Sequence, residues 1–201
     1  ALYLPHDSAY PPVYALDRDA LSATDVETLA KVCPEGAVEL DMDEEVIEVE
    51  AGAVIVATGW RPYDAANLGH LGFGRCANVI TNVMMERLAA HNGPTGGRIL
   101  RPSDGEPARN VAFVQCAGSR DENHLPYCSA VCCMASLKQV RYLREKSEET
   151  KATVVYIDIR TVGREEKFYY DMLDDENVSF VKGKVAAISE EEGTGNLVLD
   201  V

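Results

Sequence analysis

Four of the six cysteines in this 201-residue chain lie between residues 116 and 133. They are Cys116, Cys128, Cys132 and Cys133. Thiolates bind soft metal centres, and an iron–sulfur cubane needs four of them. Their types and spacing therefore make this segment the main candidate for the chemistry of the protein.

The segments on either side of the cysteines predict how they are positioned. The apolar run 110–115 predicts a buried strand that ends at Cys116, and residues 129–146 predict an amphipathic helix. A helix N-terminus carries partial positive charge, which favours thiolates over thiols. Cys128 and Cys132 are four residues apart and are expected to share one helical face. Three thiolates at the helix start and Cys116 opposite them could then enclose a cubane.

Other roles for these cysteines stay open at the level of spacing. Adjacent Cys132 and Cys133 are atypical of tetrahedral zinc sites, which favour Cys-x-x-Cys pairs. A redox disulfide, a zinc site or a set of inert buried thiols are the alternatives to the cluster. His124 lies between the cysteines and is interpreted as a loop residue rather than a ligand.

From residue 110 onward, apolar runs alternate with amphipathic segments, which predicts an α/β fold with a Rossmann-like, parallel, three-layer sheet. The strands are expected at 111–115, 153–158 and 178–181, and the helices at 129–146 and 164–173. Ligands bind at the carboxyl ends of the strands in such sheets, where Cys116 lies. The Gly-x-Gly-x-x-Gly of dinucleotide sites is missing after the first strand, where only Gly118 remains. The cysteines thus replace the pyrophosphate site.

A function of another class competes with the redox hypothesis. Asp158 ends the second predicted strand, where the acid that binds a ribose is often found. The alternative is therefore a nicotinamide- or dinucleotide-binding Rossmann domain with structural or zinc-binding cysteines and no redox role. A solvated carboxylate at the strand end is the simpler interpretation of Asp158.

Residues 51–62 predict a second ligand-contacting segment. Residues 53–57 are a β-branched apolar run typical of a strand that is buried on both faces. Gly59 lacks a side chain and would let a ligand approach closely. The run Ala57-Thr58-Gly59 resembles the strand end that packs against the nucleotide in two-dinucleotide flavoproteins. A buried strand followed by a turn is the alternative.

The first fifty residues predict a small separate unit. Residues 22–32 predict a helix that begins at a capping box of Thr24 and Glu27, and residues 37–50 predict an acidic strand pair. Cys33-Pro-Glu-Gly-Ala-Val resembles the tail of a ferredoxin repeat whose other cysteines are missing. The expected domains are a degenerate ferredoxin-like insert (1–50), a strand end and connector with a helix at 82–91 (51–109), and the Rossmann-like domain (110–201).

Composition limits the partners. The chain has 33 acidic and 19 basic residues and a net charge of −14, which repels nucleic acid and anionic lipid. No apolar run approaches the ~20 residues of a membrane span, and the first residues lack a secretory pattern, so a cytoplasmic location is expected. The missing initiator Met and the alternating run 196–201 suggest a piece of a longer protein.

Several strings together resemble the family of heterodisulfide reductase A subunits, and within it the branch found in the quinone-interacting membrane-bound oxidoreductases of sulfate reducers. They are Ala-Val-Ile-Val-Ala-Thr-Gly-Trp-Arg-Pro, Gly-Pro-Thr-Gly-Gly, Val-Gln-Cys-Ala-Gly-Ser-Arg-Asp and Pro-Tyr-Cys-Ser-Ala-Val-Cys-Cys-Met. The resemblance implies a thioredoxin-reductase-like flavoprotein with one FAD, whose Gly-rich motif would lie upstream of residue 1. It also implies a [4Fe-4S] cluster on Cys116, Cys128, Cys132 and Cys133.

The same resemblance implies a role in electron transfer. FAD would take or split an electron pair, and the cluster would pass single electrons to sister iron–sulfur and membrane subunits, with adenylylsulfate reductase as a partner in the quinone-linked branch. Within this chain, one wall of the flavin site is expected at Ala57, Thr58, Gly59, Gly118 and Ser119. The chain alone is expected to be inactive.

Overall fold

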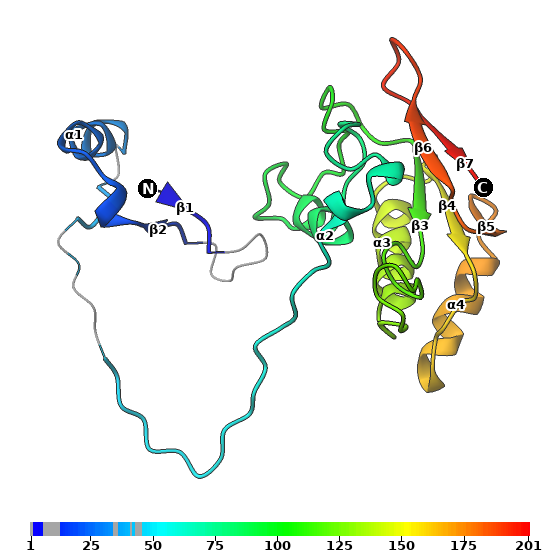
Figure 1. Cartoon of the computed structure of the whole chain (residues 1–201), viewed down its shortest axis with the longest axis horizontal. Coiled ribbons are helices and arrows are strands. Elements are labelled where there is room, and N and C mark those ends of the chain that lie inside the picture. Colours follow the sequence, from blue (N-terminus) through cyan, green and yellow to red (C-terminus); the bar gives the residue numbers. More distant parts are fainter. Residues whose placement is uncertain (1, 6–12, 34–35, 41, 43–45) are drawn as a thin grey trace. The chain divides into compact units, whose positions relative to one another are not determined.

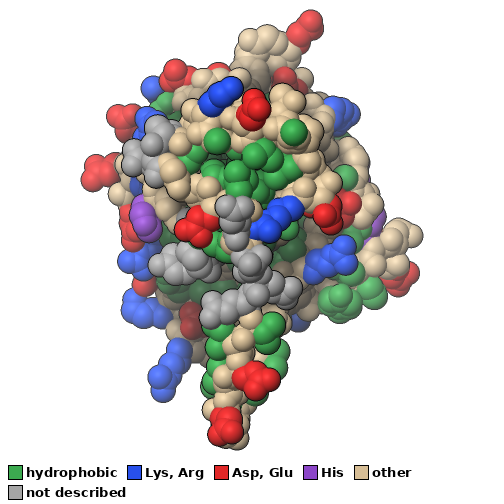
Figure 2. Space-filling view, turned by 90° about the vertical axis from the view of Figure 1, so that its left-hand side faces the viewer, with side chains coloured by type: hydrophobic (Ala, Val, Ile, Leu, Met, Phe, Trp, Pro, Cys, Tyr) green, Lys and Arg blue, Asp and Glu red, His purple; other side chains and the backbone are tan. Residues whose placement is uncertain are grey.

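The computed structural model describes residues 2–5, 13–33, 36–40, 42 and 46–201. They belong to two compact units, Ala1–Arg61 and Pro62–Val201 (Figure 1). No helix in the described part has the length and apolar character needed to cross a bilayer. Figure 2 shows acidic and basic side chains scattered over the face in view, with hydrophobic side chains at the surface between them.

The first unit contains little regular structure. β1 (Leu2–Tyr3) pairs antiparallel with β2 (Ala15–Leu16), and a short 3-10 helix (Arg18–Ala20) leads to α1 (Ala23–Val32). These elements do not confirm a ferredoxin-like insert, which remains a prediction.

The capping box of α1 involves Ser22 and Asp25. The amide of Asp25 donates to Ser22 Oγ at 3.2 Å, and the amide of Ser22 donates to the Asp25 carboxylate at 2.9 Å. The prediction of Thr24 and Glu27 was therefore wrong by two residues. Ser22 has the extended backbone that a cap requires, whereas Thr24 is already inside the helix.

The strand predicted at residues 53–57 does not form. Val54, Ile55 and Val56 have no strand partner and are 78–91% exposed. A strand pair was also predicted at 37–50. Residues 36–40, 42 and 46–50 contain no strand, and residues 41 and 43–45 lie outside the described part of the chain. An apolar strand is stable only when neighbouring strands satisfy its backbone groups and cover its faces, and local sequence supplies neither.

The second unit confirms the predicted α/β class with a parallel sheet. Its sheet has the order β3 (Asn110–Val114), β4 (Lys151–Tyr156), β5 (Val178–Lys182), and both strand pairs are parallel. The connections contain α3 (Cys132–Lys146) and, after a 3-10 turn at Gly163–Glu165, α4 (Glu166–Leu173). The alternation of strand and helix that was visible in the sequence is therefore retained in space.

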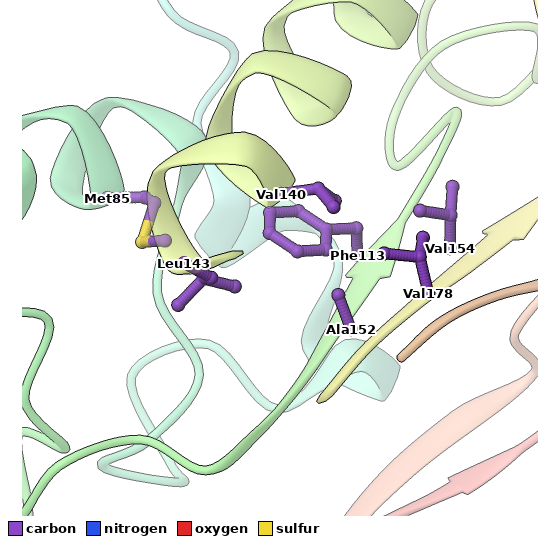
Figure 3. Packing of buried hydrophobic residues seen from close by; sticks show 7 residues of the cluster. All are labelled: Met85, Phe113, Val140, Leu143, Ala152, Val154 and Val178. Atoms are coloured by element: carbon purple, nitrogen blue, oxygen red, sulfur yellow. The ribbon is translucent and has the colours of Figure 1, made fainter. Parts of the chain in front are cut away.

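One face of this sheet is covered by helices. Phe113 of β3 and Val154 of β4 pack against Val140 and Leu143 of α3 (Figure 3). Met85 of α2 (Asn82–Ala89) belongs to the same buried cluster. Burial of such side chains stabilises the unit by roughly 1.5–3 kcal/mol each and holds α3 in place over the sheet.

A hairpin covers the other face. The hairpin consists of β6 (Ala187–Glu190) and β7 (Leu197–Asp200). Its Ile188 belongs to a buried cluster with Val155 of β4. Leu68 and Leu71, which end the 3-10 helices at Ala65–Asn67 and Gly69–Leu71, complete this cluster. The three layers are therefore helices, sheet and hairpin.

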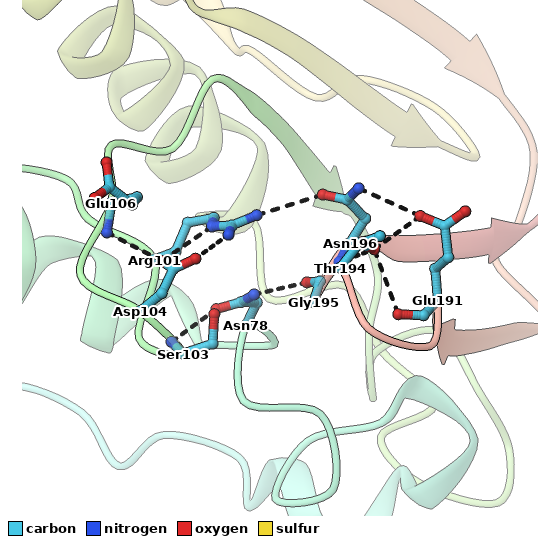
Figure 4. Close-up of polar contacts among 9 residues, drawn as sticks. All are labelled: Asn78, Arg101, Ser103, Asp104, Glu106, Glu191, Thr194, Gly195 and Asn196. Carbon is cyan, nitrogen blue, oxygen red and sulfur yellow. Dashed lines mark hydrogen bonds and ion pairs between the residues drawn. The ribbon is translucent and has the colours of Figure 1, made fainter.

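The tip of this hairpin is held by polar contacts (Figure 4). Asn78 Nδ2 donates to the carbonyl oxygen of Gly195 at 2.7 Å, and Asn78 Oδ1 accepts from the amide of Ser103 at 3.1 Å. Arg101 contacts Asn196 at 3.4 Å and pairs with Asp104. The connector residues Asn78 and Arg101 thus hold the tip of the hairpin.

Candidate metal centre

The cysteine loop, residues 116–131, joins the end of β3 to the start of α3. The amide of Gln115 donates to Val155 O at 2.9 Å, so the sheet ladder continues up to the residue before Cys116. The loop is tied together by backbone hydrogen bonds, among them Leu125 N to Gly118 O at 3.0 Å. Cys116 therefore follows directly after the hydrogen-bonded end of the strand, as predicted.

The cysteine loop contains residues with a strained, left-handed backbone conformation. Among the described residues, three non-glycine residues have positive φ, namely Cys116 (57°), Arg120 (56°) and Ala130 (58°). The left-handed conformation costs about 1–2 kcal/mol for such residues and persists only where the surroundings hold it. Strain of this kind is commonly found at functional sites.

The turn at Ala130 changes the predicted arrangement of ligands. Because α3 begins at Cys132, Cys128 lies outside the helix, and its Sγ instead accepts a hydrogen bond from the amide of Ala130 at 3.4 Å. The prediction that Cys128 and Cys132 share a helical face was therefore wrong. Spacing of four residues implies a common face only if the helix continues through both positions.

Burial raises the pKa of two of the four thiols. Burial raises the pKa of Cys116, and the nearby Cys133 and Cys128 raise it further, while Arg120 opposes the shift. Burial also raises the pKa of Cys133, with smaller contributions from Cys132 and Cys128. All six cysteines, which lie in the described part of the chain, are free thiols, so the disulfide alternative is not realised in this structure.

The site is not arranged around a single ion. No three His, Cys, Asp or Glu side chains among the described residues lie close enough together to share one metal ion. Tetrahedral zinc needs its ligands around one point, whereas a cubane binds each thiolate at a different iron corner. Both interpretations stay predictions.

Other features of the site fit a thiolate-ligated cluster. The side-chain amide of Gln115, next to Cys116, is buried with Nε2 lacking a hydrogen-bond partner in the described structure. The start of α3 has no side-chain cap at Val131, which leaves its amides to an anionic ligand. An orphaned donor, uncapped amides and four soft donors together suit an anionic cluster.

Asp158, which the dinucleotide alternative assigns to ribose binding, pairs with arginines in this structure. It binds Arg120 at 2.5 Å and Arg160 at 3.4 Å, and these contacts lower its pKa, with the Arg160 hydrogen bond the largest cause. Asp158 is thus a half-exposed acid that pairs with two arginines, and the dinucleotide alternative stays a prediction.

The predicted flavin-contacting residues are divided between the two units. Ala57, Thr58 and Gly59 are exposed in the first unit. In the second unit, Ser119 Oγ lies 2.9 Å from Ser129 Oγ, and Gly118 has φ 81°. Their role at a flavin stays a prediction.

Sequence reasoning missed the residue that contacts Gly118. A Cβ at Gly118 would lie 2.8 Å from Cδ1 of Tyr63, whose hydroxyl contacts Nδ1 of His124 at 2.7 Å. Gly118 thus makes room for a tyrosine ring. No motif connects Tyr63 with the distant cysteine loop, so only the structure could find it.

Comparison with known proteins identifies relatives of the whole chain. No protein-family model matches it. The A subunit of the ferredoxin/F420H2-dependent CoB-CoM heterodisulfide reductase of Methanosarcina acetivorans is 44% identical over 195 residues, which are 96% of this chain and 24% of that protein. The A subunit of the H2:CoB-CoM heterodisulfide, ferredoxin reductase of Methanothermobacter marburgensis is 40% identical over 192 residues, 94% of this chain and 29% of that protein.

A third relative is named for its cofactor. The iron-sulfur A subunit of the CoB–CoM heterodisulfide reductase of Methanocaldococcus jannaschii is 36% identical over 203 residues, 100% of this chain and 31% of that protein. The chain thus spans about a quarter to a third of the length of these relatives. Over that span, this chain is homologous to the family of heterodisulfide reductase A subunits.

Proposed function

We propose that the chain is part of an electron-transfer subunit of a flavin- and iron–sulfur-dependent oxidoreductase of the heterodisulfide reductase type. The single observation that carries the proposal is the cysteine loop, which places Cys116 just after β3, Cys132 and Cys133 on the first turn of α3, and Cys128 between them. The names of the relatives supply the reductase class.

Cys116, Cys128, Cys132 and Cys133 would hold a [4Fe-4S] cluster, which when bound supplies one-electron transfer. Cys116 is partly buried and Cys133 is buried, so water has limited access to these two thiols. Cys128 is oriented by the amide of Ala130, and Cys132 is placed on the first turn of α3. The positive end of α3 lies at Cys132 and Cys133 and opposes the burial that raises the pKa of Cys133.

The flavin belongs to the parent protein in this proposal. Ala57, Thr58 and Gly59 of the first unit, and Gly118 and Ser119 of the second, are the residues proposed to contact FAD. The pyrophosphate would bind to residues outside this chain. FAD would exchange an electron pair, and the cluster would exchange single electrons. This division matches a protein that connects a two-electron with a one-electron carrier.

The proposed partners follow from the names of the relatives. These name CoB–CoM heterodisulfide, ferredoxin, H2 and F420H2, and each name denotes one subunit of an assembly. Sister iron–sulfur subunits are the proposed partners. None of the three names mentions a quinone or adenylylsulfate reductase, so the sulfate-reduction branch and a membrane-bound complex rest on the sequence resemblance alone.

Anaerobic reconstitution with iron and sulfide tests the proposal. The chain should bind about four irons and four sulfides. Ser substitutions at each of the four cysteines should lower the iron content and change the visible absorption, whereas Cys33→Ser, in the other unit, should leave both unchanged. Full iron content in Cys132→Ser would contradict the ligand assignment, and stoichiometric zinc without iron would support a structural site.

A further inference from the structure

Asp158 joins two arginines that come from different segments. Arg120 Nη1 lies 2.5 Å from Asp158 Oδ1, and Arg160 Nη2 lies 3.4 Å from Asp158 Oδ2. Arg120 belongs to the cysteine loop, whereas the other two residues follow β4. We call Arg120, Asp158 and Arg160 the arginine bracket. It carries two positive charges and one negative charge in a chain whose net charge is −14.

The arginine bracket lies against the thiols. Cys133 Sγ donates to the backbone carbonyl of Asp158 at 3.9 Å. The carboxylate of the same residue pairs with both guanidinium groups. Asp158 therefore connects the two arginines directly to one of the four candidate ligands.

The conformation of Arg120 provides a second, independent observation. Its φ of 56° is one of the three strained angles of the cysteine loop, and the amide of Arg120 also donates to Tyr127 O at 3.1 Å. Strain in a non-glycine residue is retained only when its surroundings compensate for it. The ion pair with Asp158 places the Arg120 guanidinium just beyond the end of β4.

We propose that Arg120 and Arg160 raise the reduction potential of the centre held by the four cysteines, with Asp158 as the residue that positions both. This inference rests on the proposed cluster. Uptake of one electron from a reduced flavin or another one-electron donor adds one negative charge, and no bond to the protein forms or breaks. A nearby net positive charge stabilises the reduced form more than the oxidised form, so the potential rises.

A purely structural role for the arginine bracket makes a different prediction. If the arginines only fasten the cysteine loop to β4, their loss would lower the iron content without changing the potential of loaded protein. Lysine at position 160 separates the two roles, because it keeps the charge and loses the planar fork of the guanidinium. The reduction potential of the cluster depends on the charge at position 160. Attachment of the cysteine loop to β4 depends on the geometry of the side chain there.

The test is a redox titration, monitored by electron paramagnetic resonance, of the anaerobically reconstituted chain. At the wild-type midpoint potential, Arg160→Gln and Arg120→Gln should each lower the ratio of reduced to oxidised cluster about tenfold, a shift of about 59 mV to more negative values. Arg160→Lys should stay within about threefold of wild type. Loaded glutamine variants with wild-type potentials would overturn the inference.

The matched control is Arg141→Gln. It removes the same charge from α3, nine residues and so about 13 Å along the helix from Cys132, where Arg141 forms an exposed pair with Glu145. That distance exceeds the Debye length of about 8 Å at physiological salt, so the potential should not change. An equal shift in this variant would show a general effect of net charge and would contradict the inference.

The outcomes separate the inference from the proposed function. If wild-type protein binds no iron, the proposed function fails. If wild type and variants carry equal iron and equal potentials, the inference alone fails. If Arg120→Gln loses iron, Arg160→Gln decides, because it leaves the ion pair of Arg120 with Asp158 in place.

Discussion

The hydroxyl of Tyr63 lies 2.7 Å from Nδ1 of His124, in the middle of the cysteine loop. Their rings meet edge to face, with centroids 5.9 Å apart. Tyr63 follows the predicted flavin-contacting Gly59 by four residues. The contact therefore connects the loop that carries the candidate ligands to the segment at the start of the second unit.

Tyr63→Phe should loosen the cysteine loop. It removes the hydroxyl and leaves Nδ1 of His124 without this partner, so unfolding of the second unit should become easier by about 1 kcal/mol. Urea denaturation measures this change, and amide exchange at Leu125, which bonds Gly118, should become faster. Tyr127→Phe is the control, because this tyrosine of the same loop is 60% exposed. Equal effects of the two substitutions would contradict the role of the Tyr63 contact.

Gly118→Ala should be more harmful than a substitution at an open glycine. Gly118 has φ 81°, and its Cβ would lie 2.8 Å from the Tyr63 ring. Backbone strain costs about 1–2 kcal/mol, and the clash adds about 1–3 kcal/mol. Gly105→Ala is the control, because Gly105 has φ 74° and nothing within 4 Å of its Cβ, so it reports the strain alone.

The clash can be isolated in a double variant. Tyr63→Leu combined with Gly118→Ala should recover the steric part of the loss but not the strain, which a double-mutant cycle in urea measures as a coupling energy. Strict additivity of the two substitutions would show that Tyr63 and Gly118 do not interact.

Stability at acid pH should depend on Asp175. Its pKa is lowered, chiefly by the hydrogen bond from Arg144, and the side chains are only 15% (Arg144) and 23% (Asp175) exposed. A lowered folded pKa means that this contribution is fully present above the ordinary value of 3.8 and is lost as pH falls through the lower folded pKa. Urea unfolding of Asp175→Asn should show a loss of about 1–3 kcal/mol at pH 6 and a smaller loss at pH 3.

An exposed pair provides the comparison for this prediction. Lys167 and Asp171 lie 2.5 Å apart on α4, with side chains 80% and 51% exposed. Asp171→Asn should change stability by less than about 0.5 kcal/mol at pH 6. If Asp175→Asn lowered the free energy of unfolding at pH 6 by no more than Asp171→Asn does, the contact with Arg144 would not stabilise the unit.

The isolated chain should bind FAD only weakly. Tight binding needs a Gly-rich turn at a helix N-terminus for the pyrophosphate, and the 201 residues contain no Gly-x-Gly-x-x-Gly after a strand. A partial site still has to order the ligand, so a dissociation constant of about a micromolar or weaker is expected. Flavin fluorescence titration measures it. Purification with stoichiometric yellow flavin would contradict this prediction.

The local pattern of the chain was sufficient to predict the α/β scaffold of the second unit. On α3, Leu137, Val140 and Leu143 recur at helical spacing and are buried as expected. The strands at 110–114, 151–156 and 178–182 were likewise visible as short apolar runs. Periodicity acts within a few residues, so it can be recognised without knowledge of partners.

Tertiary structure decided the details of the site. The start of α3 at Cys132 depends on the turn at Ala130, and the pairing of Asp158 with Arg120 joins positions 38 residues apart. The apolar run 53–57 is a strand only if other chain segments pair with it. The sequence by itself determined which residues can supply thiolates and which segments can form helices and strands. Which of those residues meet, and which apolar run acquires partners, was decided by long-range packing, because contacts between distant segments leave no periodic trace in the chain.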